Sequence, residues 1–201
     1  MEGVQWIRPV QVDGEHVRLE PLERGHAEAL GQAARDGELW RLWVTAVPRP
    51  EEAEAYVEEA LGRQGRGDGQ AFVVRHRASG KIVGTTRYLN EDGINRRVEI
   101  GATWYAKSHQ RTAVNSECKY LLLRHAFEAL EAVAVEFRTH WHNRASRAAI
   151  ERLGAKQDGV LRQHRRAPDG RYRDTVVFSI LNSEWPAVRQ GLLYRLEEKA
   201  A

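Results

Sequence analysis

The sequence predicts an α/β (α+β) fold: a single domain over residues 1–201 with a mixed, mostly antiparallel sheet and flanking helices. Three observations support this prediction. Three consecutive strand-like segments are separated by short glycine-containing turns, which is typical of an antiparallel meander. The segments that follow read helix, strand, helix, so the strands on either side of the first helix should be parallel. A chain of 201 residues is also long enough to form one well-packed core.

The first third of the chain predicts one strand and two helices. Residues 16–22 (HVRLEPL) alternate between apolar and polar side chains and form the strand. Residues 23–36 favour a short helix. Residues 51–63 (EEAEAYVEEALGR) favour a second helix, whose acidic first turn suits the helix dipole. The irregular segment between the two helices carries two tryptophans, Trp40 and Trp43.

The middle of the chain predicts the meander and its central helix. The strands are residues 70–77, 81–90 and 96–106, joined by the turns ASG and EDGIN. From Val114 onward, apolar side chains recur with the 3.6-residue period of a helix that continues to Leu130. Because the apolar stripe is wide, we expect this helix to be buried on most sides.

The last third predicts the second half of the sheet. Residues 134–141 form the strand parallel to residues 96–106, and residues 143–154 form another helix. Two long strands follow around the turn APDG, and a helix over residues 184–199 closes the chain. We expect the core of the domain to span about residues 12–183.

A basic turn of small residues opens the central helix and is a candidate anion site. The first N–H groups of a helix lack partners and carry partial positive charge. Thr112 and Ala113 are small enough to let a ligand approach this backbone, and Arg111 and Lys107 add positive charge. The turn therefore predicts a phosphate site. The alternative is that Thr112 only caps the helix and Arg111 is a solvated surface charge.

Composition limits the classes of function. The chain is 42% hydrophobic and 29% charged with a formal net charge of +3, which favours a globular protein and does not by itself indicate a nucleic-acid partner. No segment has the pattern of a signal peptide or a membrane span, so we expect a cytoplasmic protein with no membrane partner. The only cysteine, Cys118, falls on the apolar face of the central helix and is expected to pack there.

The order of these elements resembles the GNAT superfamily of acyl-CoA-dependent N-acetyltransferases, and in particular its RimJ/RimL-like branch. The resemblance covers roughly residues 12–183, and the segments that carry it are VEIGATWY, QRTAVNSECKYLLLRHAFE, VEFRTHWHNRASRAAIERLGA and DGVLRQHRRAPDGRYRDTVVFSIL. The superfamily's pyrophosphate motif is Gln/Arg-x-x-Gly-x-Gly/Ala. Gln110, Ala113 and Asn115 occupy its fixed positions, so both glycine positions are substituted.

The resemblance implies a splayed parallel pair of strands and acetyl-CoA as co-substrate, with no metal. It also implies that the backbone of residues 101–103 polarises the thioester carbonyl and pairs with the pantetheine arm. The implied cofactor-binding residues are Gly101, Ala102, Thr103, Gln110, Arg111, Thr112, Ala113, Val114, Asn115 and Asn143.

Two residues are candidates for proton transfer. The resemblance implies that Glu99 is the general base and that Ser146 protonates the departing CoA thiolate. The alternative for Glu99 is an outward, solvated side chain or a pair with Arg87 on the neighbouring strand. The alternative for Asn143 and Ser146 is a helix cap and an ordinary first-turn residue. In some members of the superfamily a chain of water molecules replaces a single base.

Candidates for the acceptor site lie outside these motifs. Trp40 and Trp43 are expected to form an aromatic wall for the acceptor, or else to anchor their loop in the core. The basic residues 162–166 suit an acidic acceptor or a solvated hairpin end. His140 and His142 have no third partner with a metal-ligand spacing, so we expect a pair at a loop end and no metal.

The predicted function is transfer of an acetyl group from acetyl-CoA directly to a primary amine, either a protein N-terminus or a small-molecule amine. Two alternatives stay open: a catalytically inactive CoA-binding regulatory domain, and a basic RNA-associated module. The expected partners are acetyl-CoA and the amine acceptor, without nucleic acid. A homodimer through the sheet edge or the C-terminal elements is compatible with the apolar residues of the last helix.

Overall fold

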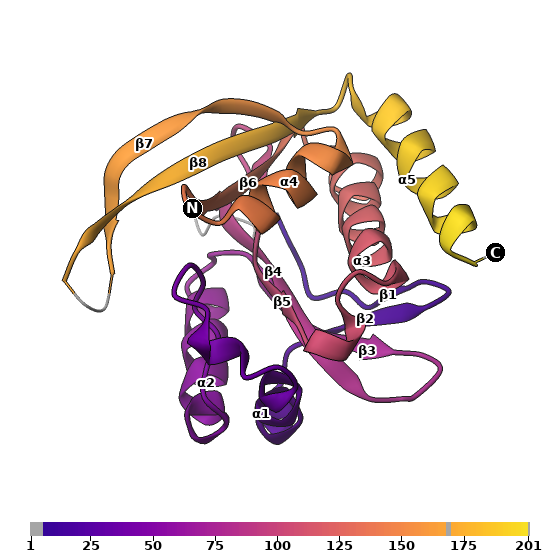
Figure 1. The fold of residues 1–201 in the computed structure, drawn as a ribbon. Helices are drawn as coiled ribbons and strands as arrows, with labels where there is room; N and C mark the ends of the chain where they lie inside the picture. The colour runs from indigo at the N-terminus through magenta and orange to yellow at the C-terminus, as the bar shows by residue number, and fades with distance from the viewer. Residues whose placement is uncertain (1–5, 168–169, 201) are drawn as a thin grey trace.

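The computed structural model describes residues 6–167 and 170–200. Its sheet has the strand order β1-β2-β3-β4-β5-β6-β8-β7 (Figure 1). The strands are β1 (Val12–Asp13), β2 (Val17–Pro21), β3 (Gln70–His76), β4 (Ile82–Asp92), β5 (Arg97–Tyr105), β6 (Ala134–His140), β7 (Lys156–Arg166) and β8 (Tyr172–Leu181). The helices are α1 (Ala27–Arg35), α2 (Ala53–Gly65), α3 (Ala113–Arg124), α4 (Arg144–Leu153) and α5 (Trp185–Ala200).

The predicted sheet topology is confirmed. Among the described strands, β5 and β6 form the parallel pair and their neighbours pair antiparallel. The crossover between β5 and β6 contains α3, as the order strand, helix, strand predicts. The short strand β1 was not predicted, because two residues are too few to show a period. It adds an edge to the sheet beside β2.

Helices cover both faces of the sheet. Figure 1 shows α1 and α2 on one side, and α3 and α5 on the other. The alternation of side chains along β3 serves both layers: Phe72 and Val74 join the apolar cluster under α3, α4 and α5, whereas Ala71 and Val73 join the cluster under α1 and α2. The consecutive apolar residues of β3 therefore reflect burial on two sides.

Helix α3 is buried on most sides, as predicted. Its described residues with little exposure are Val114, Glu117, Cys118, Lys119, Leu121, Leu122 and Leu123. The prediction that the helix continues to Leu130 needs a correction, because residues 125–129 form a π-helical turn. The wider turn changes the hydrogen bonding of the last helical carbonyl groups. The buried Tyr88 hydroxyl on β4 donates to one of them, the Leu122 oxygen, at 2.6 Å.

A buried carboxylate ties α3 to the turn between β1 and β2. Glu117 accepts three backbone N–H groups, from Glu15, His16 and Val17, each at 2.7 Å. A Cβ atom at Gly14 would lie 2.5 Å from the Glu117 Cδ, so the turn needs glycine at this position to make room for the carboxylate. The amphipathic pattern did not reveal this contact, because a charged residue is normally assigned to the exposed face of a helix.

The C-terminal part of the chain extends the sheet and closes the core. Figure 1 shows β7 and β8 as a long hairpin that arches away from the body of the sheet. Helix α5 packs Trp185 onto the π-helical turn that follows α3, where its ring stacks on Phe127 with centroids 5.5 Å apart. Among the described residues, no helix combines the length and the apolar character that crossing a membrane requires.

Candidate functional site

The parallel strands β5 and β6 pair only at their first residues. The paired positions are Arg97 with Ala134, Val98 with Val135, and Glu99 with Glu136. Strand β5 continues to Tyr105 and β6 to His140 without further pairing between them in the described residues. The two strands therefore diverge toward their carboxyl ends, where α3 and α4 begin. This divergence confirms the predicted splay, and we call the region between the two strands beyond Glu99 and Glu136 the strand opening.

A β-bulge lies on β5 at the edge of the strand opening. The β4–β5 register shifts between Thr85 and Arg87, and Ala102 has a φ of +47° and an exposed side chain. A non-glycine residue in the left-handed region is strained, and such strain persists only where the surrounding structure enforces it. After the bulge, the Thr103 hydroxyl lies 2.8 Å from the Thr86 hydroxyl.

The candidate phosphate turn leads from the end of β5 to the start of α3. Gln110 donates its side-chain amide to the Tyr105 carbonyl oxygen at 3.0 Å, which ties the turn to β5. Arg111 is exposed and has a φ of +63°. Thr112 is the N-cap of α3, and its hydroxyl accepts the Val114 N–H at 3.3 Å. Thr112 therefore caps α3, as the alternative interpretation of the sequence proposed.

The remaining predicted residues of the turn differ in how far their side chains are buried. The Val114 side chain is buried in the core, so only its backbone faces the turn. Ala113 and Asn115 are half-buried in the first turn of α3. The turn thus combines a helix N-terminus, small or half-buried side chains and one exposed arginine. This combination suits a diphosphate, which is recognised by backbone N–H groups and a nearby guanidinium.

Glu99 is buried in the sheet beside the start of the strand opening. It is 5% exposed, so the solvated alternative is wrong. Its Oε2 accepts the Asn90 side-chain N–H at 2.5 Å and lies 3.5 Å from the Arg138 Nε. Burial raises the pKa of Glu99, and Arg138 and Asn90 partly oppose that shift. A Cβ at Gly101 would lie 2.8 Å from the Glu99 carboxylate, so glycine makes room for it.

The alternative prediction that Glu99 pairs with Arg87 is also wrong. Arg87 instead donates to Glu59 of α2 at 3.0 Å, and its guanidinium lies 4.6 Å from the centre of the Tyr56 ring. The Glu99 carboxylate instead contacts Asn90 of β4 and Arg138 of β6, and the charges of Arg165 and Glu136 also act on it. A carboxyl group with a raised pKa beside a strand opening is a suitable proton acceptor.

The start of α4 borders the strand opening from the side of β6. Asn143 is the N-cap, and its Oδ1 accepts the Ser146 N–H at 3.0 Å. Asn143 therefore caps α4, as the alternative interpretation predicted. Ser146 is half-buried in the first turn. Gly154 ends the helix with a φ of +99°, a conformation that favours glycine.

The two candidate tryptophans occupy different environments. Trp40 is partly buried and packs on the apolar cluster under α1 and α2, which agrees with the anchoring alternative. Trp43 is 72% exposed, and its ring centroid lies 5.1 Å from that of His140 and 5.8 Å from that of His142. An irregular loop between α1 and α2 therefore reaches the carboxyl end of β6, close to the start of α4.

The histidine pair belongs to the end of β6. His140 is the last residue of the strand, and its Nδ1 accepts the His142 N–H at 3.0 Å. Burial lowers the pKa of His140, and the positive charge of Arg173 lowers it further. No group of three or more histidine, cysteine, aspartate or glutamate side chains within residues 6–167 and 170–200 has a geometry that could hold a metal ion.

Cys118 packs in the core as predicted. Its side chain is 0% exposed, and burial raises the pKa of the thiol to about 12. A thiol that stays protonated is a poor nucleophile, so this residue contributes packing.

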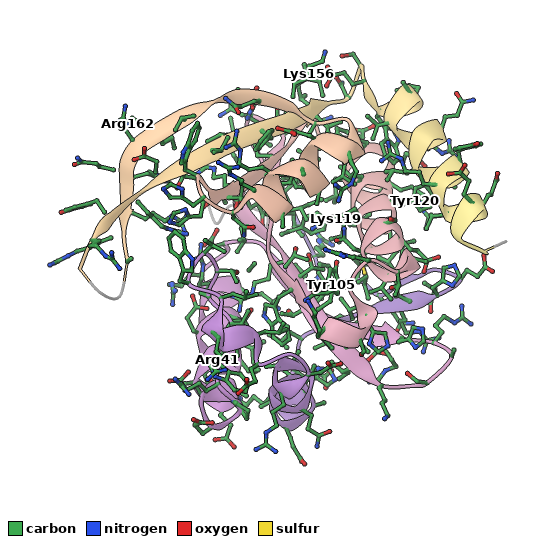
Figure 2. All side chains as sticks on the ribbon, in the orientation of Figure 1. Arg41, Tyr105, Lys119, Tyr120, Lys156 and Arg162 are labelled. Carbon is green, nitrogen blue, oxygen red and sulfur yellow. The ribbon has the colours of Figure 1, made fainter. Side chains whose placement is uncertain are left out.

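Sequence reasoning missed Lys119, the buried lysine of α3. Lys119 is 7% exposed and donates to the Thr103 hydroxyl at 2.8 Å. Figure 2 shows it in the region bounded by α3, α4 and β5, with Tyr105 near the start of α3. A signal was present in the sequence: a helix expected to be buried on most sides carries Glu117 and Lys119 within its apolar run.

Comparison with known proteins gives a consistent assignment. Residues 16–156 match the family described as an acetyltransferase (GNAT) domain. YdaF of Bacillus subtilis (strain 168), provisionally named a ribosomal N-acetyltransferase, is 28% identical over 174 residues, which is 85% of this chain and 94% of that protein. This relative supports the predicted RimJ/RimL-like branch.

Solved structures share both the fold and part of the sequence. A GCN5-related N-acetyltransferase from Brucella melitensis is 32% identical with a TM-score of 0.85, covering 94% of this chain and 86% of that one. A protein from T. thermophilus, provisionally described as an acetyltransferase, is 38% identical with a TM-score of 0.83, covering 95% of this chain and 99% of that one. The chain therefore belongs to the GNAT family and is an acyl-CoA-dependent N-acetyltransferase.

Proposed function

We propose that this acetyltransferase transfers an acetyl group from acetyl-CoA directly to the amino terminus of a ribosomal protein. The observation that carries the acyl-donor part is the strand opening, which ends at the N-terminus of α3. Residues 110–115 bind the pyrophosphate, and the pantetheine arm lies along residues 101–103 of β5. Backbone N–H groups of that segment polarise the thioester carbonyl. Asn143 contacts the pantetheine from α4.

The proposed chemistry needs a neutral amine and a proton for the leaving thiolate. Glu99 takes the proton from the acceptor ammonium, directly or through water. The amine attacks the thioester carbonyl, so that a carbon–nitrogen bond forms and the carbon–sulfur bond breaks. Ser146 donates its hydroxyl proton to the thiolate and receives, directly or through water, the proton that the attacking nitrogen loses. The raised pKa of Glu99 supports its role, because a proton acceptor works best when its pKa approaches the operating pH.

The acceptor enters beside Trp43 and the β7–β8 hairpin. The exposed Trp43 ring provides an apolar contact next to His140. Exposed arginines on the hairpin, among them Arg165 and Arg166, favour an acceptor with acidic residues. Arg162, which projects outward from the hairpin in Figure 2, is paired with Asp174 at 3.0 Å. The name of the YdaF relative supports the ribosomal part of the proposal.

One experiment tests donor and acceptor together. Thiol release from acetyl-CoA is measured with peptides that carry ribosomal-protein amino termini, with the same peptides blocked at the amino group, and with polyamines. We expect turnover only with the free peptides. Turnover with small amines alone overturns the acceptor proposal. Absence of thermal stabilisation by acetyl-CoA overturns the proposed donor site.

Variants test the proton-transfer roles. Glu99→Gln should lower kcat at neutral pH about a hundredfold and remove the acidic limb of the pH–rate profile, and Ser146→Ala should lower kcat with little change in KM. Glu54→Gln on the exposed face of α2 is the matched control. If Glu99→Gln retains the wild-type rate and pH profile, Glu99 is not the base.

A further inference from the structure

The inference concerns Lys119, whose ammonium group lies between the two diverging strands. Its Nζ donates to the Thr103 hydroxyl on β5 at 2.8 Å. On the other side, the same nitrogen lies 5.8 Å from the centre of the Phe137 ring on β6. Thr103 and Phe137 both lie beyond the last paired residues of β5 and β6, Glu99 and Glu136. The lysine thus extends from α3 into the strand opening.

This ammonium is poorly compensated. Lys119 is 7% exposed, and Thr103 is its hydrogen-bond acceptor among the described residues, so two of its three N–H donors are left over. Glu117, two residues earlier on α3, does not neutralise the Lys119 ammonium, because its carboxylate accepts hydrogen bonds from the backbone of the β1–β2 turn. A buried ammonium whose contacts are one neutral hydroxyl and, at 5.8 Å, one aromatic ring has no counter-ion among them, and its burial costs stability. Packing alone does not explain a charged side chain at this buried position.

The Thr103 contact also gives the lysine a defined direction. The Thr103 hydroxyl lies 2.8 Å from the Thr86 hydroxyl and 3.3 Å from the Gly101 carbonyl oxygen. Lys119 is therefore held against the segment of β5 just after the bulge at Ala102. In the proposed function the acyl-pantetheine chain lies along this segment. The groups of that chain that can accept a hydrogen bond from an ammonium here are its carbonyl oxygens.

We propose that Lys119 binds the acyl donor by donating a hydrogen bond to a carbonyl oxygen of the acyl-pantetheine chain. The inference rests on the proposed path of this chain through the strand opening. In this role Lys119 is a substrate-contacting residue, and Thr103 is a positioning residue that orients the ammonium. The acyl donor then supplies the partner that the buried charge lacks in the protein alone.

The test compares Lys119→Met with wild type in binding titrations against acetyl-CoA, CoA, S-ethyl-CoA and adenosine 3′,5′-bisphosphate. We expect Lys119→Met to weaken binding of acetyl-CoA about ten- to a hundredfold, the range for a lost hydrogen bond to a charged group. An equal loss for CoA and S-ethyl-CoA assigns the contact to an amide carbonyl of the arm. A loss confined to acetyl-CoA assigns it to the thioester carbonyl, which S-ethyl-CoA lacks.

Controls separate this role from a general effect on the fold. Adenosine 3′,5′-bisphosphate has no pantetheine, so its affinity should be unchanged in Lys119→Met. Lys156→Met, on an exposed lysine of β7, should leave all four affinities unchanged. Equal affinities of wild type and Lys119→Met for acetyl-CoA, or an equal loss for the bisphosphate, overturn the inference. If acetyl-CoA does not bind wild type at all, the proposed function itself fails. Lys119→Gln repeats the test with a shorter neutral side chain, should Lys119→Met not fold.

Discussion

The contact between Glu117 and the β1–β2 turn provides a sharp test of how α3 is held in place. The perturbation is Glu117→Gln, which keeps the size of the side chain and removes its charge. In the protein, Oε1 accepts the Glu15 N–H, and Oε2 accepts those of His16 and Val17. A glutamine has one acceptor oxygen, so at least one N–H group faces an amide NH₂ and is left without an acceptor.

The magnitude follows from the number and type of these bonds. A hydrogen bond to a charged group contributes roughly 1.5–3 kcal/mol, and a neutral one about 1 kcal/mol. Glu117→Gln weakens two bonds and replaces the third by a contact between two donors. We expect the free energy of unfolding to fall by about 3 kcal/mol. For a chain of this length, that is a drop of roughly 6–12 °C in Tm.

The assay is urea denaturation at neutral pH, with Glu54→Gln on α2 as the control. The control side chain is exposed, so its substitution should change the free energy of unfolding by no more than about 0.5 kcal/mol. If Glu117→Gln lowers stability by less than about 1 kcal/mol, the three bonds do not hold α3 against the turn, and the reasoning is refuted.

Gly14→Ala reaches the same contact from the other side. The added Cβ would lie 2.5 Å from the Glu117 Cδ, so the carboxylate must move away from the N–H groups that it binds. Gly65→Ala, where a Cβ meets nothing within 4 Å, is the matched control. Because both changes break the same bonds, the double variant with Glu117→Gln should lose less stability than the two single losses added together.

Three further predictions concern buried polar groups. Burial lowers the pKa of Lys119 from 10.5 to about 8, so its charge destabilises the fold fully below pH 8 and no longer does so above pH 10.5. Lys119→Met should therefore raise the free energy of unfolding at pH 7 by up to about 3 kcal/mol. This gain should vanish near pH 10.5 in urea titrations, and a gain that stays constant with pH contradicts the shift. Cys118 should react with a thiol reagent only at the rate of unfolding, and rapid labelling of the native protein would contradict its burial. Tyr88→Phe should cost about 1 kcal/mol in thermal unfolding, because the Leu122 carbonyl loses the Tyr88 hydroxyl and keeps the His125 N–H as a donor; an unchanged Tm contradicts the Tyr88 contact.

Much of the fold could be predicted because its signals are local. The meander follows from short alternating segments and glycine turns, and the parallel pair follows from a helix between two strands. The bounds of β3, β5, β6 and α4 differ from the predicted ranges by a residue or two. The π-helical turn after α3 was not predicted, because the apolar period continues through residues 125–129 and does not distinguish a π-helical turn from an α-helix.

The candidate site was predicted in part, for a similar reason. The caps at Thr112 and Asn143 are contacts within a few residues, so residue type and position indicate them. The predicted pairing of Glu99 with Arg87 was wrong. Arg138 lies on β6 and Asn90 on β4, and only the packing of three strands brings them to one carboxylate.

The sequence by itself determined the periodic elements, their order and the donor-rich start of α3, because each depends on spacing along the chain. Tertiary structure alone decided which polar groups of α3 are buried, and what they face. Glu117 and Lys119 are two residues apart on one helix, yet one meets the β1–β2 turn and the other meets Thr103 on β5. Burial depends on which elements pack around a side chain, and no period along the chain encodes that.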